Sequence, residues 1–299
     1  MGLRAGESCC IVTDDERQAI GEALSTVARE TADEVTLVRY PPGDQHGEEP
    51  PESVAAAMTG ADVVLAPTTT SLSHTRARTE ATDAGARVAT LPGITDGVFL
   101  MGLDADYEAI ATECARIHEA VAGADELRVT SPQGTDVTVR PGDRAWRQDT
   151  GIVHDPGEMS NLPAGEVFVS PETAEGTVVV DGTMMPHGRI DRPVEFAVSD
   201  GRVTDVADEG LREELETAAA DAGDAAYNFA EMGIGTNVAV RDLVGSVLLD
   251  EKASGTVHFA VGDDHGIGGD VEAPIHLDGV LTDPTVTVDG EPLALPEPQ

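Results

Sequence analysis

The stretch GTVHFAVGDDHGIGGDVEAPIHLDG, residues 255–279, contains three of the eight histidines of the chain between two short apolar runs. Strand alternation in the first run places His258 on the face opposite Val257. In the second run, His276 and Asp278 share one face, because strand residues two apart point the same way. Two neighbouring strands that each present an imidazole, one of them with a carboxylate, predict a metal site. The alternative is a pair of ordinary strand histidines.

Two further acidic residues occupy positions that differ from simple surface charges. Glu166 follows a Pro-Ala-Gly turn in NLPAGEVFVSPE, and Glu231 lies between Ala230 and Met232 before a Gly-rich turn in NFAEMGIGTN. Together with the two histidines and Asp278 they form a set of five ligands that suits Zn²⁺, Mn²⁺, Co²⁺ or Fe²⁺. Five ligands exceed a closed tetrahedral site, and they are enough for two metals that share a bridging carboxylate.

The composition describes a strongly acidic α/β protein. The chain has 299 residues, enough for two domains, and 56 acidic against 18 basic residues give a formal net charge of −38. Only Lys252 is a lysine. This balance excludes a basic nucleic-acid surface, so no nucleic-acid partner is expected. It resembles proteins of extremely halophilic archaea, in which molar salt screens the mutual repulsion of the charges.

The cysteines and the apolar segments predict a cytoplasmic protein. Cys9, Cys10 and Cys114 are odd in number and lack CxxC spacing, which argues against a disulfide framework or a structural zinc site. The N-terminal segment lacks the long apolar region of a signal peptide, and no run of 18 apolar residues is present. We therefore expect no membrane association.

The first 125 residues predict a doubly wound domain with a parallel sheet. Apolar strands at 8–15, 34–40 and 61–68 alternate with helical patterns, the last of which covers 106–124. No GxGxxG follows the first strand, so no dinucleotide cofactor is expected. SLSHTRAR, residues 71–78, allows an anion site at a helix N-terminus, and the alternative there is an ordinary capped helix.

The pattern changes after residue 125. Residues 126–144 predict a β-hairpin, and several later short strands are joined by Asp-Gly turns. We therefore expect a domain boundary near residue 125, with a parallel α/β domain at 1–125 and an α+β metal-binding domain at 126–299.

The motifs LPAGE, AEMGIGTN, DEKASGTVHFAVGD and APIHLDG, taken together, resemble the aminopeptidase T family of metallopeptidases. The resemblance covers nearly the whole chain, including ADVVLAPTTTSLSHTRAR and GARVATLPGIT in the first domain. It implies that two divalent ions, zinc, cobalt or manganese, are held by five residues: Glu166, Glu231, His258, His276 and Asp278. It also implies an aminopeptidase that releases N-terminal amino acids from peptides through a metal-activated water, and a homo-oligomer.

One departure leaves the reaction open. The peptidases have a catalytic tyrosine seven residues after the first ligand histidine, and His265 stands at that position here. On the peptidase interpretation, Glu231 is the bridging ligand and His265 replaces the tyrosine in catalysis. Relatives of the family include 2,5-dihydroxypyridine 5,6-dioxygenase, which implies the alternative of a single Fe(II) held by His258, His276 and Asp278. A non-catalytic ligand-binding relative is the third possibility.

Overall fold

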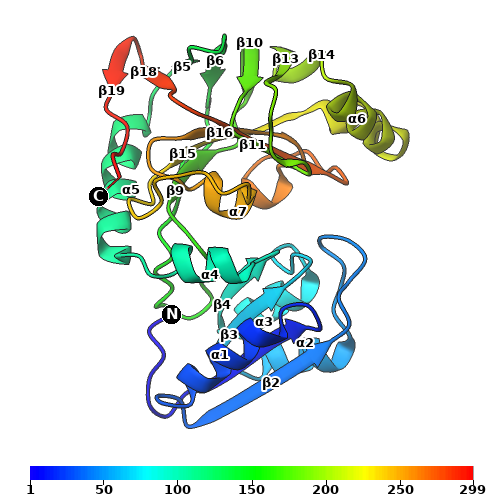
Figure 1. The fold of residues 1–299 in the computed structure, drawn as a ribbon, viewed down its shortest axis with the longest axis vertical. Helices are drawn as coiled ribbons and strands as arrows, with labels where there is room; N and C mark the ends of the chain where they lie inside the picture. Colours follow the sequence, from blue (N-terminus) through cyan, green and yellow to red (C-terminus); the bar gives the residue numbers. More distant parts are fainter. Residues whose placement is uncertain (299) are drawn as a thin grey trace. The chain divides into compact units, whose positions relative to one another are not determined.

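The computed structural model describes residues 1–298 and divides the chain into two compact units. The first contains residues 1–107 and 149–164, and the second contains residues 108–148 and the chain from 165 onward. The mixed α/β class, with a parallel sheet followed by antiparallel sheets, is confirmed (Figure 1). The boundary predicted near residue 125 lies within the second unit and stays a prediction.

The first unit is built on a five-stranded parallel sheet in the order β2-β1-β3-β4-β8. Its strands are β1 (Ser8–Asp14), β2 (Glu34–Tyr40), β3 (Val63–Thr68), β4 (Arg87–Pro92) and β8 (Met159–Asn161). Its helices are α1 (Gln18–Ala28), α2 (Glu52–Thr59), α3 (Arg76–Asp83) and α4 (Asp96–Gly102), and α5 (Tyr107–Val121) follows.

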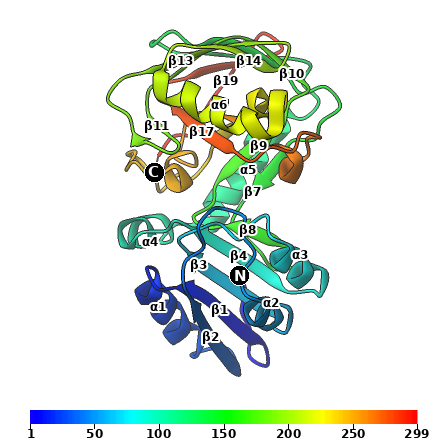
Figure 2. The ribbon, with the colours of Figure 1, turned by 90° about the vertical axis from the view of Figure 1, so that its right-hand side faces the viewer.

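Alternation along β1 gives this sheet two apolar faces. Cys9 and Ile11 pack in a cluster with Ala28 of α1, whereas Cys10 and Val12 pack in a second cluster with residues of α2 and α3. Figure 2 shows α1 and α2 on opposite sides of the sheet. The adjacent cysteines are therefore free, buried core residues of opposite faces, as strand geometry requires.

The helix that was considered as an anion site is capped by the chain itself. The hydroxyl of Thr75 accepts a hydrogen bond from the backbone N–H of Arg78. The two carboxylate oxygens of Glu49 accept hydrogen bonds from the N–H groups of Arg76 and Ala77, at 2.5 and 3.1 Å. An internal carboxylate therefore occupies the N-terminus of α3, as an ordinary capped helix requires.

The second unit contains two seven-stranded sheets. The first runs in the order β14 (Arg202–Val206), β13 (Val194–Ser199), β10 (Thr173–Val180), β6 (Asp136–Arg140), β5 (Leu127–Thr130), β18 (Thr285–Val288) and β19 (Glu291–Leu293). The second runs in the order β12 (Gly188–Arg189), β11 (Thr183–Met184), β17 (His276–Leu281), β16 (Val257–Gly262), β15 (Phe229–Gly235), β9 (Glu166–Val169) and β7 (Arg147–Asp149). Helix α5 belongs to this unit except for Tyr107. Helices α6 (Glu209–Ala222) and α7 (Val247–Asp250) and the 3-10 turns η1 (Gly223–Tyr227) and η2 (His265–Ile267) complete the unit.

Two of the predicted Asp-Gly turns close hairpins in the first of these sheets. Asp200 and Gly201 join β13 to β14, and Asp289 and Gly290 join β18 to β19, with positive φ at all four residues. Positive φ at both central residues is what a two-residue hairpin turn requires, and Asp-Gly accepts it readily. Among the helices of residues 1–298, none combines the length and the apolar character needed to cross a bilayer.

Candidate metal centre

Four adjacent strands of the second sheet, in the order β17-β16-β15-β9, bring the predicted ligands to one face. Ala260 of β16 is paired with Asp278 on one side and with Glu231 on the other. His258 lies two residues before Ala260 and therefore shares its face. His276 lies two residues before Asp278, so it points the same way. The register of three antiparallel strands thus gathers residues that are up to 47 positions apart in the sequence, from 231 to 278.

Small residues leave the space that the imidazole needs. Gly233 of β15 is directly opposite His258 in the register. A Cβ at Gly233 would lie 2.1 Å from Cε1 and 2.2 Å from Nε2 of that ring. The imidazole therefore lies over a backbone position that only glycine can provide. Glu166 joins the same face because it is paired with Gly235, which is two residues further along β15.

Glu231 is the centre of the arrangement. Its Oε1 is 3.4 Å from Nε2 of His258, and its Oε2 is 3.3 Å from Nε2 of His276. Nε2 of His276 is also 3.4 Å from Oδ1 of Asp278. On the other side, Nε2 of His258 is 3.4 Å from Oε2 of Glu166. The structure thus brings all five predicted ligands into one cluster.

The ring of His276 is oriented by the backbone. Its Nδ1 lies 2.6 Å from the carbonyl oxygen of Asp263, so an N–H at Nδ1 donates to that carbonyl and Nε2 faces the carboxylates. A backbone carbonyl behind the ring is one of the usual partners of a histidine that ligates a metal. His258 is fully buried, and its Nδ1 has no hydrogen-bond partner among the described residues.

The donor atoms fall into three groups, and within each group they lie within 4.8 Å of one another. The groups are Glu166, Glu231 and His258; Glu231, His276 and Asp278; and Glu251, His258 and Asp278. Ligands about 2.0–2.1 Å from a tetrahedral ion stand about 3.3–3.4 Å apart, which matches the spacings around Glu231. The carboxylate and imidazole donors can therefore bind a divalent metal ion, and the shared Glu231 links two of the groups.

Glu251 and Lys252 are part of the cluster, and the sequence analysis did not predict them. Nζ of Lys252 is 2.9 Å from Oε1 of Glu166 and 2.5 Å from Oε1 of Glu251. The side chain of Lys252 is 1% exposed. One signal was available, because a single lysine in so acidic a chain is unusual, and it lies shortly before strand β16, which begins at Val257 and carries His258.

The charged groups of the cluster strongly shift each other's pKa values. Burial by itself lowers the pKa of His258, but the hydrogen bond with Glu231 and the neighbouring carboxylates outweigh it and raise the pKa to about 9. The pKa of His276 is raised well above its usual value by Asp278 and Glu231, again against burial. Burial raises the pKa of Glu231, but its two histidine partners reverse this and hold the pKa below the usual range.

Glu251 behaves differently from Glu231. Burial raises the pKa of Glu251 to about 7, although the charge of Lys252 acts in the opposite direction. In the metal-free protein, protonated imidazoles thus balance the negative charge of the carboxylates. A bound ion would supply that positive charge instead.

His265 does not take part in the donor groups of residues 1–298. It begins η2 in the loop between β16 and β17, and its side chain is exposed. The loop is held by Asp264, which accepts hydrogen bonds from Ser170, Asn228 and the N–H of Val271.

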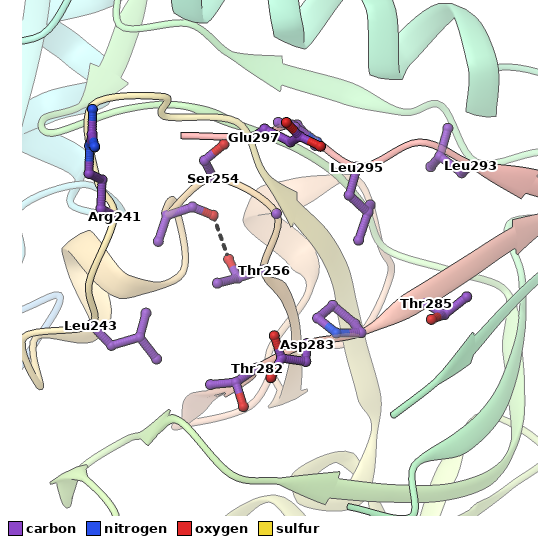
Figure 3. A pocket seen from close by; sticks show the side chains of 14 residues that line it. Arg241, Leu243, Ser254, Thr256, Thr282, Asp283, Thr285, Leu293, Leu295 and Glu297 are labelled. Atoms are coloured by element: carbon purple, nitrogen blue, oxygen red, sulfur yellow. Dashed lines mark hydrogen bonds between the residues drawn. The ribbon is translucent and has the colours of Figure 1, made fainter. Parts of the chain in front are cut away.

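A groove elsewhere in the second unit is lined by none of the cluster residues (Figure 3). It runs past Ser254, Thr256, Asp283 and Leu295, and Thr256 donates to the carbonyl oxygen of Ala253 at its edge. The donor side chains of the sheet face thus do not line this groove.

Two solved structures have a fold similar to that of this chain. The structure is similar to that of 2,5-dihydroxypyridine dioxygenase from Pseudomonas putida KT2440, with a TM-score of 0.81 and 20% identity over 97% of this chain and 90% of that one. It is also similar to wild-type AmpT from Thermus thermophilus, with a TM-score of 0.67 and 18% identity over 98% and 95% of the two chains. These likenesses confirm the predicted fold relationship to both proteins.

Among curated proteins, none matches the chain significantly. The family of 2,5-dihydroxypyridine 5,6-dioxygenases, in contrast, matches residues 2–295, which is nearly the whole sequence. The chain therefore belongs to the 2,5-dihydroxypyridine 5,6-dioxygenase family.

Proposed function

We propose that this protein is a metal-dependent dioxygenase that opens a small dihydroxylated aromatic ring of the 2,5-dihydroxypyridine type. The observation that carries the proposal is the buried cluster in which both imidazoles contact one carboxylate, that of Glu231, at 3.3 and 3.4 Å. Membership of the family supports the reaction class. The cluster supports a divalent ion, and we assign Fe(II) as that ion.

The imidazoles of His258 and His276 and the carboxylate of Asp278 are the groups that would hold the ion, and Glu231 contacts both imidazoles. A bound Fe(II) with open positions supplies a place where ring hydroxyls and O₂ can meet. The two imidazoles must be neutral to ligate, so the ion takes the place of their protons.

The chain's own residues prepare the site for a phenolic substrate. The carbonyl of Asp263 fixes the ring of His276, and Gly233 leaves space for the ring of His258. Glu251, with a pKa raised to about 7, is suited to accept a hydroxyl proton at neutral pH. The burial of His258, Glu166 and Glu231 keeps water away from this side of the site.

The test is oxygen consumption by protein purified anaerobically in molar salt, with 2,5-dihydroxypyridine as substrate and iron content measured in parallel. We expect one iron per chain and uptake of one O₂ per ring opened. His276→Ala is expected to lose both the metal and the activity. Full activity of that variant, or oxygen uptake that does not depend on metal, would refute the proposal.

A metal-dependent aminopeptidase is the second candidate, and a specific observation favours it. Glu231 belongs to two donor groups, and its Oε1 and Oε2 face the imidazoles of His258 and His276 respectively, an arrangement that suits a carboxylate bridging two ions. Two zinc, cobalt or manganese ions there would activate a water for attack on the first peptide bond of a substrate. Release of amino acids from aminoacyl-anilides, with two ions per chain and no oxygen uptake, would favour this candidate.

The homo-oligomer and the adaptation to high salt remain predictions. Light scattering across a salt series tests both, because a chain with a net charge of −38 is expected to lose compactness when salt no longer screens its charges.

A further inference from the structure

The imidazole of His276 is the less enclosed of the two imidazoles in the cluster. Its side chain is 32% exposed, whereas that of His258 is 1% exposed and is fixed by packing. His276 is also the first residue of β17. The orientation of its ring therefore depends on the hydrogen bond from Nδ1 to the carbonyl oxygen of Asp263, at 2.6 Å. The position of that carbonyl decides the direction in which Nε2 points.

The peptide unit between Asp263 and Asp264 is held at both ends. Its carbonyl oxygen faces Nδ1 of His276, and its N–H, which belongs to Asp264, donates to the carbonyl of Val271 at 3.0 Å. Because a peptide unit is planar, a bond to its N–H also restricts the direction of its carbonyl. The N–H of Asp263 adds a bond to the carbonyl of Ile275 at 2.7 Å.

The side chain of Asp264 connects this peptide unit to the sheet. It is 3% exposed, and its Oδ2 accepts from the hydroxyl of Ser170 at 2.9 Å and from Nδ2 of Asn228 at 3.0 Å. Ser170 directly follows β9 and Asn228 directly precedes β15, and both strands carry members of the cluster. Oδ1 accepts from the N–H of Val271 at 2.7 Å. One buried carboxylate thus joins both ends of the loop to the sheet.

The outer side of the same loop has more exposed attachments. Arg144 pairs with Asp270 at 2.8 Å, but the side chain of Asp270 is 88% exposed. Arg147 donates to the carbonyl of Gly266 at 3.3 Å. Exposed ion pairs contribute little to stability, because water and salt screen them. The buried carboxylate of Asp264 is therefore the stronger attachment.

We propose that Asp264 is a positioning residue for the metal centre, which holds the peptide unit that orients His276 and thereby sets the affinity for the ion. The inference rests on the metal centre of the proposed function. It holds for a dioxygenase and for a peptidase, because both use His276. Asp264 acts through a backbone carbonyl and belongs to none of the donor groups of residues 1–298. Loss of a group that orients a ligand histidine typically lowers metal affinity by about 10- to 100-fold.

Two substitutions disturb this carboxylate in different ways. Asp264→Asn keeps its shape but turns one acceptor into a donor, so either the N–H of Val271 or Nδ2 of Asn228 loses its acceptor. Gly269→Ala keeps the carboxylate, but the new Cβ would lie 1.9 Å from its Cγ, so the carboxylate must move. Asp270→Asn is the matched control, because it makes the same change on an exposed side chain of the same loop.

Each metal-free protein is titrated with Zn²⁺ by calorimetry in molar salt, and its histidine ring protons are observed by NMR after ¹⁵N labelling of histidine. We expect Asp264→Asn and Gly269→Ala to bind Zn²⁺ about 10- to 100-fold more weakly than the wild type. Asp270→Asn should stay within about twofold of it. The Nδ1 proton of His276, assigned by its loss in His276→Gln, should resonate at low field in the wild type and should move upfield or disappear in the first two variants.

A purely structural role for Asp264 makes a different prediction. The variants would then unfold at lower temperature, but the folded proteins would keep the wild-type affinity for Zn²⁺ and the wild-type His276 resonance. That result would overturn the proposal, and so would an equal loss of affinity in Asp270→Asn. If neither Asp264→Asn nor Gly269→Ala folds, Ser170→Ala decides, since it removes a single hydroxyl donor. A smaller loss of affinity with a shifted resonance is expected there, and no change in either would count against Asp264.

Oxygen uptake tests the proposed function separately. Zn²⁺ binding that depends on Asp264, without oxygen uptake by the Fe(II)-loaded wild type, would refute the dioxygenase and leave the role of Asp264 standing. Oxygen uptake by the wild type, together with unchanged Zn²⁺ affinity in Asp264→Asn and Gly269→Ala, would refute the role of Asp264 alone.

Discussion

Metal binding by the chelator-treated protein is expected to release protons. The pKa of His258 is raised to about 9, and that of His276 is raised well above its usual value. At pH 7 both imidazoles of the metal-free protein are therefore protonated. A divalent ion needs neutral imidazole and repels a positive ring beside it, so binding displaces about two protons.

The size of the pH effect on metal affinity follows from the pKa of His258. Removing a proton at pH 7 from a group with a pKa of about 9 costs a factor of about 100 in affinity, or about 3 kcal/mol. The His258 proton alone should make the apparent association constant rise about tenfold for each pH unit below pH 9, and displacement of a proton from His276, whose pKa is also raised, makes the rise steeper. Glu231 does not contribute to this slope, because its lowered pKa keeps it ionised throughout.

The stability of the metal-free protein is expected to fall as the pH rises, whereas its affinity for metal rises. Because the folded pKa of His258 is raised, its contribution to stability is complete below the unfolded value of about 6.5 and is lost as the pH rises through about 9. Glu251 acts with the same sign at lower pH, since its pKa is raised to about 7. Raising the pH from 6.5 to above 9 should thus remove up to about 3 kcal/mol from the His258 contribution.

Calorimetry in two buffers of different ionisation enthalpy measures the released protons directly, with Zn²⁺ or Co²⁺ as the ion and molar salt throughout. His258→Gln is expected to reduce the number from about two to about one. Thermal unfolding with and without chelator, across the same pH range, checks the stability. Binding that releases no protons, together with an affinity that does not change with pH, would refute the reasoning.

Three further substitutions test the site and the fold. Gly233→Ala is expected to lose bound metal, because its Cβ would lie 2.2 Å from Nε2 of His258. Gly97→Ala is the control, since the nearest atoms to its Cβ would lie at 3.9 Å. Elemental analysis compares the metal content of the two variants. His265→Ala is expected to keep its metal and its turnover, since the side chain is exposed, and loss of most of the turnover would contradict this. Arg87→Met should lower the free energy of unfolding by about 3 kcal/mol in denaturant titrations, because it breaks a buried ion pair; an unchanged midpoint would count against that pair.

The alternation of apolar and polar residues along short segments was sufficient to predict the strands that carry the histidines. Alternation in VHFAVG and IHLDG predicts two strands with His258 on one face and with His276 and Asp278 on one face, and both strands are present. The same reasoning predicted the parallel sheet of the first unit and the Asp-Gly hairpins. These predictions succeed because the period of a strand and the φ values of a turn depend on residues that are close in sequence.

The placement of Glu166 and Glu231 beside the histidines needed more than local pattern. Their local surroundings and the motif resemblance singled out these residues, but no spacing in the chain indicates that Gly235 is paired with Glu166 or Ala260 with Glu231. Long-range register alone decides which side chains meet, because a shift of one residue would turn each side chain to the opposite face.

The sequence by itself determined the strongly acidic charge and the alternation of the strands, and it predicted five candidate donor residues. The tertiary structure decided how these donors group around Glu231, and it added Glu251 and Lys252 to the cluster. It also put His265 on an exposed turn. The physical reason is that the affinity and the number of bound ions depend on charges a few ångströms apart in space. A sequence shows that a lysine is present, and only the fold shows that its ammonium group lies between two carboxylates.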